Sequence, residues 1–230
     1  MNIKELLFGE ITHLSNVNRY SGMRLNQNES VAEHSYYVAL FSYAISEHLE
    51  SKFPELTIEL SKLLTRCLLH DISEAISGDI IRPFKHSDTN LNNLINEKSS
   101  LIVKQFEKKL KLNLLDHHDN AKDESLEGFI LKIADLMSVL SFSVRELFSG
   151  NKYTLPVICN THNCFVSLRK ELMTADINID LKYQKEFIHM IDEILSYSEI
   201  DIHNPDKQFG IYPISFNDEV LWFVPEEENE

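Results

Sequence analysis

Apolar residues recur every three or four positions along most of this chain, which is the spacing of helices with one buried face. In the first stretch, Ile3, Leu7, Ile11 and Leu14 fall on one side of a predicted helix over residues 2–15. The same spacing predicts one or two helices between residues 91 and 110, and further helices over 31–49, 57–76, 126–149, 158–173 and 181–198. The pattern therefore predicts an all-α protein.

Local signals mark where several of these helices begin and end. Ser30 followed three residues later by Glu33 is a capping box, which indicates a helix start. Pro54 interrupts the chain after that helix. Gly78 and Gly150 stand where a glycine commonly follows the last helical turn.

The C-terminal stretch "FGIYPISFNDEVLWFV" differs from the rest, because it is aromatic and alternates apolar with polar residues. We expect a short irregular or hairpin-like extension there. In the chain as a whole, six glycines and six prolines leave little room for a turn-rich β architecture. With no repeat and no clear linker, residues 1–230 are predicted to form one domain. Its motifs lie within 14–150, and 151–230 carries C-terminal helices and the tail.

The formal net charge of −14 argues against duplex nucleic acid and anionic membrane surfaces as partners. It leaves room for a single nucleotide, which a metal and one or two arginines can hold locally. No apolar stretch approaches the length of a membrane span. Three cysteines without metal-type pairing, and no secretory signal, indicate reduced thiols and a cytoplasmic location.

Four polar side chains stand out because they fall among apolar residues of predicted helices: His34, His70, Asp71 and Asp135. Burying such groups is costly unless something pairs with them. Two imidazoles and two carboxylates form a mixed nitrogen and oxygen set that suits one divalent ion, such as Mn²⁺ or Co²⁺, with Zn²⁺, Fe²⁺ or Mg²⁺ also open.

Each of these residues alone has an ordinary explanation. His34 could be a hydrogen-bonded core histidine, and Asp135 could pair with Lys132 or Arg145. An adjacent His-Asp pair also occurs by chance in many proteins. Three helices that each bury such a group are harder to explain without a cation, so the sequence favours a metal site.

The arrangement of an isolated His, a His-Asp pair and a distant Asp resembles the HD-domain metal-dependent phosphohydrolases. The stretches "VNRY", "MR", "SVAEHSYYVA", "LLHDISEAISGDIIRPFKH" and "KIADLMSVL" with "ELFSGN" are similar to the bacterial YfbR-type 5′-deoxynucleotidases. The resemblance implies an HD-domain helical bundle and a homodimer. It also implies hydrolysis of a (deoxy)nucleoside 5′-monophosphate to nucleoside and phosphate.

Two acidic residues beside the ligand set are candidates for catalysis. Glu74 lies four residues after His70, so a continuous helix would place its carboxylate beside the metal, where it could orient or deprotonate water. A solvated helix residue or a partner of a histidine ligand is the ordinary alternative. For Asp79 the resemblance implies contact with the sugar hydroxyl or proton donation to the leaving 5′-oxygen, against an ordinary role in a turn.

Three further residues are candidates for substrate binding. The resemblance assigns phosphate binding to Arg19, whose guanidinium fork suits phosphate oxygens, and Lys85 is a weaker candidate for the same role. Tyr20 departs from the family pattern, in which tryptophan follows the arginine. An aromatic ring here could exclude a 2′-hydroxyl, while the smaller tyrosine leaves ribonucleotides or a modified substrate open.

The sequence is also compatible with two other functions. A deoxynucleoside triphosphate triphosphohydrolase on the same scaffold would need more cations than Arg82 and Lys85 in the segment that follows Asp79. A non-catalytic nucleotide-sensing module would be free to lose Glu74 and Asp79. His117 and His118 could serve a second metal, but a solvated loop explains them better, so one metal is predicted.

Overall fold

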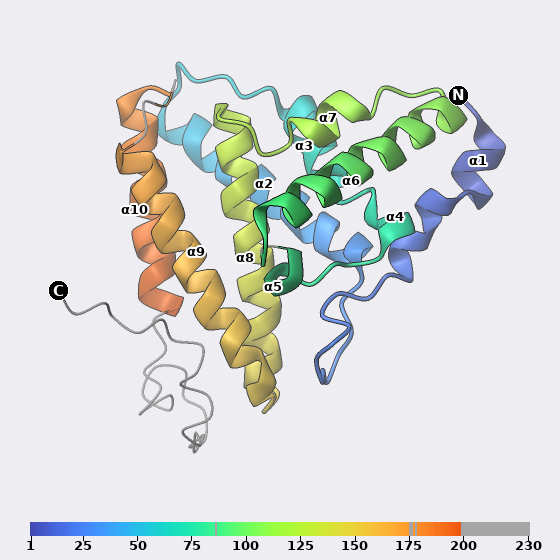
Figure 1. Cartoon of the computed structure of the whole chain (residues 1–230). Helices are drawn as coiled ribbons and strands as arrows, with labels where there is room; N and C mark the ends of the chain where they lie inside the picture. Colours follow the sequence, from blue (N-terminus) through green and yellow to red (C-terminus); the bar gives the residue numbers. More distant parts are fainter. Residues whose placement is uncertain (86, 175–176, 178, 199–230) are drawn as a thin grey trace. The chain divides into compact units, whose positions relative to one another are not determined.

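The computed structural model describes residues 1–85, 87–174, 177 and 179–198, and every regular element within these ranges is helical (Figure 1). This confirms the all-α prediction. None of the described helices is both long and apolar enough to cross a membrane. The predicted hairpin-like extension lies in the part of the chain that the structure does not describe.

The chain divides into two compact units. The first comprises Met1–Met23 and Asn28–Ser138, and the second comprises Arg24–Gln27 and the described residues from Val139 onward. The single domain expected over residues 1–230 stays a prediction.

The first unit is organised around α2, Val31–Lys52, which packs against α3, Leu60–Leu69. The predicted capping box is present at the start of α2. The Ser30 hydroxyl oxygen accepts the Glu33 backbone N–H at 3.2 Å, and the Glu33 carboxylate accepts the Ser30 backbone N–H at 2.7 Å. Both polar groups therefore satisfy backbone donors that a helix start leaves unpaired.

The single helix predicted over residues 2–15 is wrong. The structure has a short α1, Ile3–Phe8, and a 3₁₀ helix η1, Glu10–Ser15, separated at Gly9, whose ψ of 173° takes the chain out of helical geometry. Ile3 and Leu7 are exposed, so the predicted apolar face is wrong as well. Other apolar residues of this segment, Leu6, Ile11 and Leu14, pack on the core instead.

The predicted helix over residues 57–76 is also interrupted, and it begins later than expected. After α3 ends at Leu69, the chain makes a tight turn through residues 70–73, and α4 follows at Glu74–Ser77. At this point the Cys67 carbonyl accepts a hydrogen bond of 2.7 Å from the His70 ring. The break places His70 and Asp71 at a helix end rather than along a helix face.

Gly78 follows α4 with a φ of +71°, which confirms its predicted place after a helix end. The segment after it contains a short α5, Arg82–Lys85. One long helix, α6, Thr89–Leu110, follows where one or two helices were predicted between residues 91 and 110. The polar segment that follows contains α7, Leu115–Asp119. A core cluster joins this part of the unit through Ile72, Ala75, Val103, Phe106, Leu110 and Leu114.

The helix α8, Leu126–Phe148, belongs to the first unit up to Ser138 and to the second unit from Val139. The second unit also contains a 3₁₀ turn η2, Lys152–Thr154, and the helices α9, Leu155–Thr174, and α10, Leu181–Ser198, which lie side by side (Figure 1). These agree with the predicted helices over 126–149, 158–173 and 181–198, with α9 beginning three residues early. All four candidate ligands belong to the first unit, because each lies between Asn28 and Ser138.

Candidate metal centre

Two imidazoles lie side by side in the first unit. His34 is fully buried in the first turn of α2, and His70 is buried directly after α3. Their ring centroids are 5.4 Å apart. Each ring is oriented through its Nδ1 atom: that of His34 lies 3.0 Å from the Ser138 hydroxyl, and that of His70 donates to the Cys67 carbonyl. Because a carbonyl only accepts, neutral His70 keeps its lone pair on Nε2.

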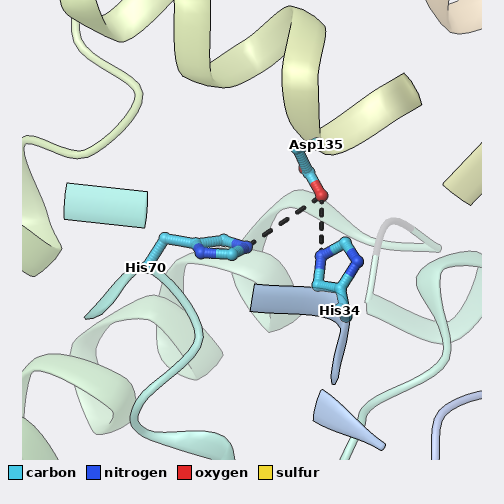
Figure 2. Close-up of side chains that lie close together, drawn as sticks. All are labelled: His34, His70 and Asp135. Carbon is cyan, nitrogen blue, oxygen red and sulfur yellow. Dashed lines mark ion pairs between the residues drawn. The ribbon is translucent and has the colours of Figure 1, made fainter. Parts of the chain in front are cut away.

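The two Nε2 atoms face a carboxylate from α8 (Figure 2). Asp135 Oδ1 lies 3.0 Å from His34 Nε2 and 4.0 Å from His70 Nε2. Both Nε2 atoms are buried and neither makes a hydrogen bond of acceptable geometry. Ligand atoms from these three residues all lie within 4.8 Å of one another.

Asp71 lies beside the same nitrogens. Its Oδ2 is 3.1 Å from His70 Nε2 and 3.7 Å from His34 Nε2. The structure therefore brings together all four residues that the sequence nominated as ligands. Buried imidazole nitrogens without hydrogen bonds, flanked by two carboxylates, fit a divalent cation with nitrogen and oxygen ligands.

The protonation states also suit a cation. Burial, reinforced by the positive charge of Arg19, lowers the pKa of His34 to about 4 and outweighs the opposite effect of Asp135, so the ring is neutral at pH 7. Burial alone would raise the pKa of Asp135, but Lys122 and His34 hold it well below its ordinary range. A neutral His34 ring and the Asp135 carboxylate charge are therefore available to a cation.

Glu74 lies close to this cluster although α3 and α4 are not one helix. Its Oε2 is buried and has no hydrogen-bond partner. Burial, together with the charges of Asp71 and Asp79, raises the pKa of Glu74 to about 9. A carboxyl with one buried, unbonded oxygen and a raised pKa beside a ligand set is a common property of catalytic acids and bases.

Asp79 makes a contact that the sequence did not reveal. Its Oδ2 accepts the backbone N–H of Tyr20 at 2.9 Å. Tyr20 has a φ of +56°, a left-handed conformation that is uncommon for a residue with a side chain. Asp79 therefore holds the segment that carries Arg19 and Tyr20, which is a different role from the two implied by the resemblance.

Arg19 points at the ligand cluster. Its Nη1 lies 3.6 Å from Asp71 Oδ2, and its Nε lies 3.6 Å from Glu29 Oε2. The Glu29 carbonyl also accepts the Arg19 backbone N–H at 2.8 Å. The sequence did not identify Glu29 as part of the site. The only feature that could have drawn attention to it is its acidic side chain directly before the capping serine.

The remaining candidates lie farther from the nitrogens. Lys85, on α5, is near enough for its charge to oppose the raised pKa of Glu74. His118 lies on α7, where its Nδ1 is 2.8 Å from Asp119 Oδ1. Among the described residues, His117 and His118 are not part of the ligand group at His34 and His70.

Lys122 is a second residue that sequence reasoning missed. Its Nζ donates to Asp135 Oδ2 at 2.5 Å. The sequence had offered Lys132 or Arg145 as partners for Asp135, and Lys132 Nζ instead lies 4.2 Å over the Phe129 ring. No local pattern identifies Lys122, because it stands in a polar segment 13 residues before Asp135.

Known proteins resemble this chain in sequence and in fold. The sequence profile of the YfbR-like 5′-deoxynucleotidase family matches residues 6–157. A 5′-deoxynucleotidase of Enterobacter sp. (strain 638) is 25% identical over 194 residues, which cover 81% of this chain and 94% of the relative. A 5′-deoxynucleotidase of Klebsiella pneumoniae is 28% identical over 155 residues, which cover 63% and 74% of the two chains.

Two solved structures share the fold. An HD-domain phosphohydrolase from Listeria innocua aligns with a TM-score of 0.64 and 24% identity, covering 85% of this chain and 99% of the other. A cyanophage S-2L HD phosphohydrolase, solved with dA and one catalytic Zn²⁺ ion, aligns with a TM-score of 0.54 and 15% identity over 82% of this chain and 96% of the other.

Proposed function

This chain belongs to the YfbR-like 5′-deoxynucleotidase family, and from that premise we propose that it hydrolyses (deoxy)nucleoside 5′-monophosphates to nucleoside and phosphate. The observation that carries the proposal is the pair of buried, unbonded Nε2 atoms of His34 and His70 between the carboxylates of Asp71 and Asp135. Such a set has a clear use in phosphate ester hydrolysis, and a structural core would gain nothing from it.

His34, His70, Asp71 and Asp135 would hold one divalent ion, with Mn²⁺ or Co²⁺ as first candidates and Zn²⁺, Fe²⁺ or Mg²⁺ as others. When bound, the ion supplies Lewis-acid stabilisation of the phosphoryl oxygens and lowers the pKa of water. At pH 7 His34 is neutral and Asp135 is ionised. Metal binding therefore requires no proton to leave or join these two residues.

With a cation bound, whose charge favours the carboxylate over the protonated form, Glu74 would orient the attacking water and take its proton as the water oxygen bonds to phosphorus. The Glu74 carboxyl would then give that proton to the 5′-oxygen as its bond to phosphorus breaks, so that nucleoside and phosphate are released. Support comes from its buried, unpaired oxygen beside Asp71. Asp79 already accepts the Tyr20 N–H with one oxygen, so we assign its other oxygen to a sugar hydroxyl rather than to proton donation.

Arg19 would bind the phosphate. Its Nη1 faces the ligand set through Asp71, while Glu29 supports the guanidinium through Nε. A planar fork can contact two phosphate oxygens at once, which an ammonium group does not do. Lys85 is a more distant candidate for the same anion.

Few cations near the ligand set favour a monophosphate over a triphosphate. Arg19 and Lys85 are the two cations assigned to the phosphate, whereas Lys122 is paired with Asp135. A triphosphate would carry more negative charge than these groups can offset.

The homodimer remains a proposal based on family resemblance, and light scattering of the purified protein tests it.

The metal-stripped full chain, reloaded with Mn²⁺ or Co²⁺, should release inorganic phosphate from dAMP and leave dATP largely intact. Including AMP in the same assay tests whether Tyr20 still excludes a ribose. Triphosphate released from dATP would make the protein a triphosphohydrolase. Nucleotide binding without turnover of any substrate would make it a sensing module.

Replacing Arg19 with lysine should raise the KM for dAMP about tenfold, because the charge stays but the two-pronged contact is lost. The content of bound metal should not change, since Arg19 is not a ligand. The same change at Arg145, which is exposed on α8, serves as the control. An unchanged KM in the Arg19→Lys variant would remove Arg19 from the phosphate site.

A further inference from the structure

The two carboxylate oxygens of Asp135 have different partners. Oδ1 faces the imidazoles, at 3.0 Å from His34 Nε2 and 4.0 Å from His70 Nε2. Oδ2 accepts a hydrogen bond of 2.5 Å from Lys122 Nζ. The orientation of the carboxylate is therefore set on one side by Lys122.

The segment that carries Lys122 is anchored at the next residue. Asp123 forms a two-pronged ion pair with buried Arg66 of α3, with distances of 2.8 Å from Nη2 to Oδ2 and 3.1 Å from Nη1 to Oδ1. The Ser125 backbone N–H also donates to Asp123 Oδ1 at 3.1 Å. On the other side of Lys122, Ala121 is buried.

This anchoring distinguishes the pair from ordinary surface ion pairs. Exposed lysine–carboxylate pairs contribute little because two flexible side chains must be held in one geometry. Here the lysine starts from a backbone position fixed by Arg66 and Asp123, and the carboxylate belongs to α8. Asp135 itself is only 17% exposed.

We propose that Lys122 is a positioning residue for the metal centre: by holding Asp135 Oδ2, it directs Oδ1 toward His34 and His70 and keeps Asp135 a ligand through one oxygen. The inference deepens the proposed function and rests on it. Carboxylates that bind metals are themselves hydrogen-bonded, and losing such a partner typically weakens metal binding or activity ten- to a hundredfold.

The charge of Lys122 has an opposite effect that must be weighed. An ammonium group near the site repels a divalent cation, so removing it would tighten metal binding if repulsion dominated. Two observations favour orientation over repulsion. The ammonium charge is offset by the Asp135 carboxylate with which it pairs, and it contacts Oδ2 rather than Oδ1, the oxygen that faces the imidazoles. The sign of the change in metal affinity decides between them.

The variant Lys122→Met removes the donor while keeping a similar length, and Lys122→Arg keeps a cationic donor. Lys109→Met is a matched control, because Lys109 Nζ lies 2.6 Å from Glu10 Oε2 and its side chain is 41% exposed, away from the ligand set. Each metal-stripped full chain is titrated with Co²⁺ by calorimetry, and the visible absorption of the Co²⁺ form is recorded. The kcat and KM for dAMP follow at saturating Co²⁺.

Lys122→Met should weaken Co²⁺ binding about tenfold and change the Co²⁺ absorption spectrum, because a freed carboxylate can bind through both oxygens. Its KM should stay at the wild-type value once the metal is saturating. Lys122→Arg should bind Co²⁺ within threefold of wild type, and Lys109→Met should match wild type.

Equal Co²⁺ affinity and spectra in Lys122→Met and Lys109→Met overturn the inference, and so does tighter binding in Lys122→Met. A raised KM with unchanged Co²⁺ affinity also overturns it, because Lys122 would then be a substrate contact. Failure of the proposed function is seen separately: the wild-type protein would bind no Co²⁺, or would release no phosphate from dAMP.

Discussion

Replacing His34 with glutamine should abolish metal binding and lower turnover of dAMP by roughly a thousandfold or more. The expected size follows from the several kcal/mol that a metal ion contributes to stabilising charge in the transition state, at about 1.4 kcal/mol for each tenfold. His34 Nε2 is buried, lacks a hydrogen bond and faces the oxygens of Asp135 and Asp71. Glutamine keeps a polar group near Ser138 but has no imidazole lone pair.

The metal content of the purified variant, measured by elemental analysis next to its kcat, checks this result. His48→Gln is the matched control, because His48 lies on the same helix but is exposed at its far end. A His34→Gln protein that retains one metal ion per chain would contradict the ligand assignment. Circular dichroism distinguishes loss of metal from loss of fold.

Replacing Glu74 with glutamine should lower kcat by roughly a hundred- to ten-thousandfold, the range expected when a general base is removed. The content of bound metal should stay unchanged, because Glu74 is not one of the four proposed ligands. Glu59→Gln removes the same charge from an exposed residue at the start of α3 and serves as the control. Turnover in Glu74→Gln close to wild type would exclude Glu74 as the base.

The same variant has an expected effect on stability in the metal-free protein. Burial, with the charges of Asp71 and Asp79, raises the pKa of Glu74 from 4.5 to about 9. Between these values the folded state holds a proton that the unfolded chain releases, so this carboxyl makes folding less favourable as pH rises from about 4.5 toward 9. Glutamine does not titrate. Metal-free Glu74→Gln should therefore melt above the wild type near pH 8, with a smaller difference near pH 5.

That measurement separates two explanations for an inactive variant. A protein that is inactive but more stable in the metal-free form has lost a catalytic group, because its fold is intact. A melting temperature below wild type at pH 8 would instead mean that the Glu74 carboxylate stabilises the fold. The outcome also tests whether this residue is kept for function at the expense of stability.

The ligand residues could be nominated from the sequence because each breaks a strong local rule. His34, His70 and Asp135 are polar groups at positions where the helical period calls for apolar ones. The structure brings their ligand atoms together, and their roles as ligands stay predictions. Lys122 breaks no such rule, because a lysine in a polar segment is ordinary, and so it was missed.

The fold was predictable wherever a local signal was strong. The capping box at Ser30 and Glu33 and the long apolar period of α8 gave helices close to the expected ranges. The prediction of one helix in the N-terminal segment was wrong. The spacing of apolar residues continues through Gly9, but the backbone leaves helical geometry there. The helix predicted through His70 was wrong, because the chain breaks there and the His70 ring donates to the Cys67 carbonyl. The spacing of apolar residues carries no information about such a side-chain hydrogen bond.

The sequence by itself determined the helical class, several helix boundaries and the chemical types of the ligand set, because these depend on residues within one or two turns of each other. Tertiary structure decided which side chains share the site: His34 with Ser138, 104 positions apart, Tyr20 with Asp79, 59 apart, and Lys122 with Asp135. Such pairings are set by how helices pack in space. A periodic pattern along the chain says which face of a helix is buried, but not which residue of another helix meets it.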